Sequence, residues 1–207
     1  NRKTDWMRLQ MYDTQTGKLV KTLIEEKDNK WLEPDQAPVF VSGKPNEFIW
    51  RSYQTQSGFH NYQHINLEGK ILGEWSTPYE QLSILGFNEN ATHIYIATTT
   101  ADAMHTGAII GDMKNYSVQN IITGKGLHDM HFSSNGAYIL DQFNVSGIPN
   151  QAVVRTSTGK LAQQLLVSED KLKGFKIGQT ELGVIAEVSR RLRPEVTVGE
   201  ATVAREL

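Results

Sequence analysis

Short apolar runs alternate with polar, turn-forming residues along almost the whole chain, and no helical periodicity is sustained before residue 170. The runs hold 4–7 residues, many of them β-branched or aromatic, and Gly, Asn, Pro or Ser separates one run from the next. This pattern is typical of strands that are joined by tight turns. It therefore predicts an all-β protein built from antiparallel hairpins.

The hairpins repeat with a period of about 45 residues. Turn-like segments around Asn46, Ala91 and Gly136 stand 45 and 45 residues apart. Each segment follows an apolar run that ends in phenylalanine, and each precedes another apolar run. A repeat of ~40–50 residues with four short strands is the signature of a β-propeller blade.

A second series of turns marks the later hairpin of each repeat. Gly69 and Gly159 each stand in a Gly-Lys turn, and the 90 residues between them are twice the period. The member between them is expected near residue 114, where the sequence reads Asp-Met-Lys-Asn. The two series together place four strands in each repeat.

The predicted fold is an all-β partial propeller of about three and a half four-stranded antiparallel blades, within residues 1–185. The expected parts are a half blade at 5–24, whole blades at 38–76, 82–122 and 128–167, and a linker with an exit strand at 171–185. The charged stretch from Glu25 to Asp35 is expected to be a connection. Residues 186–207 fit neither the repeat nor a helix, which Pro194 would break, so we treat them as an extension outside the repeat.

Three and a half blades do not obviously close a ring, since propellers close with ~4–8 blades. Open edges would leave strands unpaired, which folded proteins avoid. We therefore expect that two copies of the chain could pair their open edges as a homo-oligomer.

Composition narrows the function classes. Lys and Arg number 21 against 23 Asp and Glu, and no apolar run approaches the ~18 residues of a membrane span. Nucleic acid, an anionic membrane surface and a membrane span are therefore not expected. The chain has no cysteine, which excludes disulfides, thiol catalysis and cysteine-ligated metals and fits a cytosolic or a periplasmic protein equally well. Its start has neither an initiator methionine nor a signal-peptide pattern, so we expect that a longer chain was its source.

No catalytic motif stands in the sequence. The Gly-x-Ser-x-Gly string of a nucleophile elbow is missing, so no catalytic residue is assigned. The histidines form two close pairs, His60 with His64 and His128 with His131. On a strand the members of the second pair would point to opposite faces, and those of the first would lie ~13 Å apart. We therefore predict no metal site and no cofactor.

The aromatic residues in or beside strands are expected to pack between blades. This group comprises Trp31, Trp50, Trp75, Tyr62, Tyr95 and Tyr138. Trp31 and its neighbour Glu33 have a second interpretation, given below.

Several segments, in order along the chain, resemble one known family. They are Asp5–Asp13, Trp31–Pro34, Phe48–Ser52, Tyr79–Leu82, Leu127–His128 and Gly147–Pro149. Together they resemble the later blades of the N-terminal propeller of dipeptidyl peptidase IV, in the prolyl oligopeptidase family of serine peptidases. The resemblance covers residues 5–185. It departs from the family at Thr55-Gln56-Ser57, where the family has an acidic pair that belongs to a turn.

This resemblance implies a non-catalytic propeller fragment that serves as scaffold and substrate-access wall for an α/β-hydrolase domain outside this sequence. The implied partners are a peptide substrate and that hydrolase domain, and the implied location is periplasmic or secreted. The resemblance also implies that Trp31 and Glu33 face the substrate. The alternative from another class is a stand-alone propeller-type module that binds a protein on its face.

Overall fold

The computed structural model describes residues 5–29, 31–32, 36–53, 55, 57–175 and 178. The described residues form fourteen strands and no helix, so none of them provides a helix that could cross a membrane. The strands are β1 (Trp6–Tyr12), β2 (Leu19–Lys27), β3 (Val39–Val41), β4 (Lys44–Ser52), β5 (Asn61–Asn66), β6 (Ile71–Glu74), β7 (Gln81–Phe87), β8 (His93–Thr99), β9 (Thr106–Asp112), β10 (Val118–Ile122), β11 (Leu127–Phe132), β12 (Tyr138–Val145), β13 (Ile148–Thr156) and β14 (Leu161–Val167).

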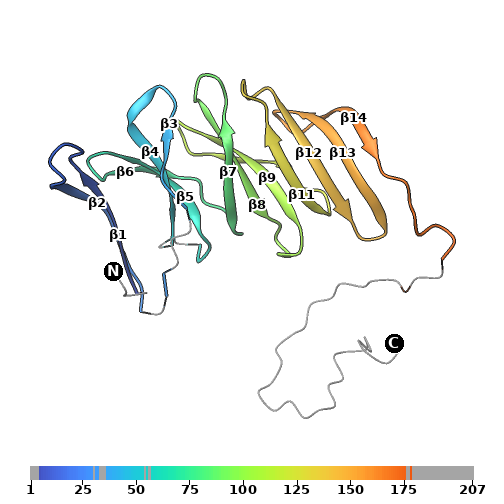
Figure 1. Cartoon of the computed structure of the whole chain (residues 1–207), viewed down its shortest axis with the longest axis horizontal. Coiled ribbons are helices and arrows are strands. Elements are labelled where there is room, and N and C mark those ends of the chain that lie inside the picture. The colour runs from blue at the N-terminus through green and yellow to red at the C-terminus, as the bar shows by residue number, and fades with distance from the viewer. Residues whose placement is uncertain are drawn as a thin grey trace, which may run out of the picture. The chain divides into compact units, whose positions relative to one another are not determined.

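The strands form one two-stranded sheet, β1–β2, and three four-stranded sheets, β3–β6, β7–β10 and β11–β14. Every hydrogen-bonded pair in the described sheets joins consecutive strands, and every pair is antiparallel (Figure 1). Three repeated four-stranded meanders after a single hairpin are the architecture of a partial propeller. The predicted fold class is confirmed.

Two compact units divide the chain, 1–170 and 171–207. All described strands belong to the first unit. In the second unit residues 171–175 form turns. The exit strand predicted to end at residue 185 and the extension at 186–207 lie outside the described residues.

The first hairpin runs further than predicted. Glu25, Glu26 and Lys27 were expected in a connection, but they belong to β2 and pair with β1. Glu26 is buried, and its carboxylate accepts hydrogen bonds from Trp50 Nε1 at 3.1 Å and from the Ser52 hydroxyl at 2.9 Å. A charged residue here is part of the packing between two sheets, so charge alone was a misleading signal for a loop.

The turns that join the first two strands of each sheet contain one residue with positive φ. These residues are Gly43, Ala91 and Gly136, with φ of 73°, 47° and 67°. Their spacing is 48 and then 45 residues, and Asn46, which we had placed in the first turn, lies in β4. The structure therefore confirms the repeat, although the distance between the first two turns is three residues longer than the predicted 45.

The later turns also contain a residue with positive φ. Gly69 and Gly159 have φ of 84° and 83°, and Tyr116 takes this role in the middle sheet with φ of 59°. The turn expected near residue 114 is therefore present, between β9 and β10. Gly69 packs so closely on the preceding hairpin that a Cβ would lie 2.7 Å from the Leu23 carbonyl oxygen. Glycine at this turn allows neighbouring sheets to approach.

Apolar side chains fill the space between successive sheets. The largest cluster joins sheets β3–β6 and β7–β10 and consists of Val41, Ile49, Tyr62, Trp75, Ala91, Ile94, Ile96, Ile109 and Met113. The Trp75 side chain is fully buried, and its Nε1 donates to the Asp112 carbonyl at 3.0 Å. Trp50, Tyr62, Trp75 and Tyr95 are buried as predicted, whereas Tyr138 and Trp31 are 51% and 61% exposed.

Candidate functional site

In each four-stranded sheet, the loop between the second and third strands and the connections to neighbouring sheets lie at the same end of the strands. In an antiparallel meander, the loop between the second and third strands lies beside the connection to the next sheet. The loop 100–105 between β8 and β9 is therefore near the connections 75–80 and 123–126. We call this end of the sheets the connection end.

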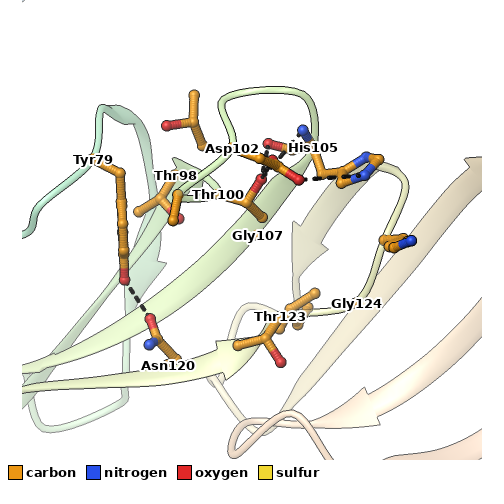
Figure 2. Close-up of a pocket in the computed structure, with 13 residues that line it drawn as sticks. Tyr79, Thr98, Thr100, Asp102, His105, Gly107, Asn120, Thr123 and Gly124 are labelled. Carbon is orange, nitrogen blue, oxygen red and sulfur yellow. Dashed lines mark hydrogen bonds and ion pairs between the residues drawn. The ribbon is translucent and has the colours of Figure 1, made fainter. Parts of the chain in front are cut away.

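A pocket of about 380 Å³ lies at the connection end of sheet β7–β10 (Figure 2). Its lining comes from one loop, two connections and the strands beside them: Tyr79, Thr98, Thr99, Thr100, Ala101, Asp102, His105, Gly107, Asn120, Ile122, Thr123, Gly124 and Lys125. The volume falls within the range of small-molecule sites, ~300–1,000 Å³. We call it the threonine pocket.

The β8–β9 loop that forms one rim of the threonine pocket is fixed by Asp102. Its carboxylate accepts hydrogen bonds from the Thr100 hydroxyl and from the Met104 backbone N–H, the latter at 3.1 Å. His105 Nε2 lies 3.7 Å from the other carboxylate oxygen. The hydrogen bond from Thr100, followed by that from Met104, holds the pKa of Asp102 below its ordinary value. The rim therefore carries a negative charge, and both hydrogen bonds engage the same oxygen, Oδ1.

The side of the pocket across from Asp102 holds a pair of polar groups. Figure 2 shows the Tyr79 hydroxyl donating to Asn120 Oδ1. Burial raises the pKa of the Tyr79 hydroxyl, so this group stays protonated and donates at neutral pH. The bond engages the amide oxygen of Asn120, and its NH₂ group makes no hydrogen bond within the described residues.

A charged cluster at the connection end ties the first complete sheet to the second. Arg51 donates through Nε to the Gln81 carbonyl at 2.8 Å and through Nη2 to the Glu80 carboxylate. The same carboxylate contacts the His60 imidazole and accepts the His60 backbone N–H at 3.1 Å. These contacts join β4 to the connection before β7, so the cluster helps to fix two sheets against each other.

A second cluster lies within the last sheet. Asp141 is fully buried, accepts a hydrogen bond from Arg155 Nε at 2.7 Å and lies 2.8 Å from His128 Nδ1. Because an ionised carboxylate can only accept, His128 Nδ1 is the donor in this contact. Nε2 is buried and has no hydrogen-bond partner in the described part of the chain. His131 is exposed, so the second histidine pair does point to opposite faces.

Histidine and acidic residues do not assemble as a metal site in the described part of the chain, where no group of three His, Cys, Asp or Glu side chains could hold an ion. His60 and His64 have separate carboxylate partners, Glu80 and Glu47.

The two predicted substrate-facing residues are not in the threonine pocket. Trp31 lies in the connection between β2 and β3 with 61% of its surface exposed. Glu33 lies outside the described residues. Their role in holding substrate stays a prediction.

Sequence reasoning missed the threonine pocket. The segment Gly124-Lys125-Gly126, which connects β10 to β11, carries no motif that would mark a site. The available signal was the run Thr98-Thr99-Thr100, which places three successive hydroxyl groups at the point where β8 meets its loop. This run forms part of a pocket only because the connections 75–80 and 123–126, about 20 residues before and after it, lie beside it in the fold.

Comparison with known proteins identifies the family. The family model described as "Dipeptidyl peptidase IV (DPP IV) N-terminal region" matches residues 1–150. The chain is 25% identical over 200 residues to a "Probable dipeptidyl-aminopeptidase B" of Pyrenophora teres f. teres, covering 89% of this chain and 22% of that protein. It is 24% identical over 183 residues to the "Dipeptidyl-aminopeptidase B" of Aspergillus niger, covering 82% of this chain and 20% of that protein.

Among solved structures, Porphyromonas gingivalis dipeptidyl peptidase 4 superposes with a TM-score of 0.75 at 16% identity, covering 88% of this chain and 26% of that one. This likeness supports the fold. The chain spans about a fifth of the length of the curated relatives that it matches. The family match over most of the chain, together with the propeller architecture, shows that this chain belongs to the family of the dipeptidyl peptidase IV N-terminal region.

Proposed function

We propose that this chain is the propeller portion of a dipeptidyl peptidase IV-like serine exopeptidase. In this proposal it is a scaffold and substrate-access wall beside an α/β-hydrolase domain that is encoded outside this sequence. The observation that carries the proposal is the family match over residues 1–150 on a chain that folds as successive propeller sheets. Peptide substrate and the hydrolase domain are the partners that it implies.

The packing between sheets suits a wall that must hold its shape. The buried Glu26 carboxylate joins the first hairpin to β4, and the Arg51–Glu80 ion pair joins β4 to the start of β7. Arg51 and Glu80 side chains are only 9% and 23% exposed, so they are screened by solvent less than a surface pair. Polar contacts of this kind fix the orientation of one blade against the next.

Catalysis in this proposal belongs to the other domain. The purified chain is expected to leave a chromogenic Xaa-Pro dipeptide substrate intact, while the product of the complete reading frame cleaves it. Cleavage by the purified chain, or an inactive complete product that is folded, would contradict the proposal.

Trp31 and Glu33 are proposed to face the substrate in the parent protein. Trp31 is largely exposed on a connection, so replacing it removes little packing. Trp31→Ala in the parent protein should raise KM several-fold with little change in kcat or melting temperature. Trp50→Ala is the matched control, because Trp50 is buried and its loss should lower stability by about 3–5 kcal/mol. A loss of stability without a change in KM at Trp31 would count against the role.

We also propose that two copies of this chain, when it is isolated, pair through open blade edges. The outermost strand β14 supports this, because all seven of its residues are exposed. Its apolar members are Leu161, Leu165, Leu166 and Val167.

A further inference from the structure

The threonine pocket has an unusual balance of hydrogen-bonding groups. Lys125 is a lining residue, and its ammonium has no carboxylate or hydrogen-bond partner in the described part of the chain. The Thr98 and Thr123 hydroxyls and the Asn120 NH₂ group likewise make no hydrogen bond there. All of these groups can donate, and Lys and amide nitrogens can only donate.

The one carboxylate of the pocket has one of its two oxygens engaged by hydrogen bonds. Asp102 accepts from the Thr100 hydroxyl and the Met104 N–H, and His105 lies beside it. The pocket therefore offers several free donors and few free acceptors, so it suits a ligand that accepts hydrogen bonds and carries negative charge.

Thr98 makes the pocket more than a surface patch. Its side chain is 3% exposed, yet its hydroxyl has no partner within the described residues. Its cross-strand partner is Gly107, and a Cβ there would lie 2.4 Å from the Ile122 carbonyl oxygen and 3.7 Å from the Thr98 hydroxyl. Glycine at 107 thus keeps open the space that the Thr98 hydroxyl faces. Unlike His128 Nε2, the Thr98 hydroxyl is not a fully buried unpaired atom, so a ligand in the pocket can reach it.

The geometry points to a binding site for a carboxylate-bearing peptide in the threonine pocket, with Lys125 as the charge partner and Thr98, Thr123 and Asn120 as donors. The choice of a peptide, rather than another carboxylate, rests on the proposed function. About 380 Å³ exceeds what a bare carboxylate fills. The apolar surface of Ala101 and Ile122 beside the donors would contact the rest of the peptide.

Titration of the isotope-labelled chain with acetyl-Ala-Ala bearing a free C-terminal carboxylate tests this inference, with chemical shifts of Thr98, Thr123 and the Asn120 side-chain amide as the readout. The expected affinity is on the order of millimolar, and the C-terminal amide of the same peptide should bind at least about fivefold more weakly. Acetyl-Asp-Ala-amide separates the two sources of a carboxylate: binding equal to that of acetyl-Ala-Ala assigns the site to acidic side chains as well as to C-termini. Equal binding of the carboxylate and amide forms of acetyl-Ala-Ala would overturn the inference.

Matched variants locate the binding. Lys125→Gln should weaken acetyl-Ala-Ala binding about fivefold, and the near-isosteric Thr98→Val should weaken it several-fold. Lys70→Gln, in the turn after β5 at the other end of its sheet, should leave binding unchanged. Asp102→Asn should bind acetyl-Ala-Ala at least as tightly, because it removes a like charge. Weaker binding of acetyl-Ala-Ala by Asp102→Asn with an intact fold would overturn the inference, because removal of a like charge should not weaken the binding of an anion.

The two proposals fail separately. The titration uses this chain alone and needs no peptidase activity, whereas the cleavage assay on the complete reading frame needs no threonine pocket. Binding without cleavage in the parent would refute the peptidase proposal only, and cleavage without binding would refute the pocket only.

Discussion

At the residue scale, buried polar side chains decide how the sheets meet. Glu26 is 4% exposed in the hairpin β1–β2, and its partners Trp50 and Ser52 belong to β4. Its neighbour Glu25 is of the same type but faces solvent, where it pairs with Lys27 at 2.8 Å. The two adjacent glutamates therefore differ in environment and not in chemistry.

Glu26→Ala should lower the free energy of unfolding by about 2–4 kcal/mol, because it strands the Trp50 N–H and the Ser52 hydroxyl without an acceptor. Glu25→Ala is the control and should cost less than about 1 kcal/mol. Urea unfolding followed by tryptophan fluorescence measures both. Equal losses for the two variants would refute the structural role of Glu26.

His64 provides a pH-dependent contribution. It is buried against Trp75 and Tyr116, and burial lowers the pKa of its imidazole, although the Glu47 carboxylate opposes that shift. Below the unfolded value of 6.5 the unfolded chain then binds more protons than the folded one. The stability that neutral His64 provides is complete above that pH and is lost as pH falls through it.

We expect wild-type protein to lose more stability than His64→Gln as the pH falls from about 7.5 to about 5.5, as measured by urea midpoints. His131→Gln, at an exposed position of the last sheet, should follow the wild-type curve. Parallel curves for wild type and His64→Gln would show that His64 does not titrate differently on folding.

At the element scale, the sequence predicted the sheets well because turn chemistry is local. Gly69 and Gly159 identified their turns directly, and their positive φ explains why glycine stands there. The middle turn had no glycine, yet the period alone placed it. Sequence reasoning failed at Glu25–Lys27, because pairing with β1 and the contact of Glu26 with β4 outweighed the polar local pattern. It also failed at Asn46, because the first turn lies three residues earlier than predicted.

The threonine pocket could not be predicted for a related reason. Its donors come from Thr98 in β8, Asn120 in β10 and the connection that holds Lys125. Each of these is an ordinary polar residue in its own hairpin. Only the packing of loop against connection brings them together, and nothing in the spacing of a single repeat encodes that packing.

Contact between sheets is also tight at β6. Gly73 in β6 lies under the ring of Tyr116, so a Cβ at residue 73 would overlap that ring. Gly73→Ala should therefore destabilise the protein by about 1–3 kcal/mol. In a Tyr116→Gly background the same change should cost almost nothing, because the ring is gone.

Gly124→Ala is the control for Gly73→Ala, since the nearest atom to a Cβ at residue 124 is His128 Nε2 at 3.9 Å. Its effect should stay within about 0.5 kcal/mol. A thermal-unfolding double-mutant cycle gives all four values. Additive effects of Gly73→Ala and Tyr116→Gly would refute the contact.

At the scale of the whole molecule, the apolar surface of β14 bears on assembly. Light scattering of the isolated chain should give a mass that rises toward that of a dimer with concentration. Leu165→Lys and Leu166→Lys place a charge on neighbouring positions of β14, and at least one should return the chain to the monomer mass. A monomer mass for the wild type at every concentration would refute pairing through this edge.

The strictly sequential strand order has a consequence for how the chain acquires its structure. Within the described sheets each strand pairs only with strands that are its neighbours in the sequence, so strand pairing has low contact order and small loop-closure costs. Each sheet can then form as a separate foldon, and the coupling between foldons comes from side chains such as Glu26, Arg51 and Trp75. Native-state hydrogen exchange should consequently resolve opening steps sheet by sheet, with β14 exchanging earlier than the strands around Trp75.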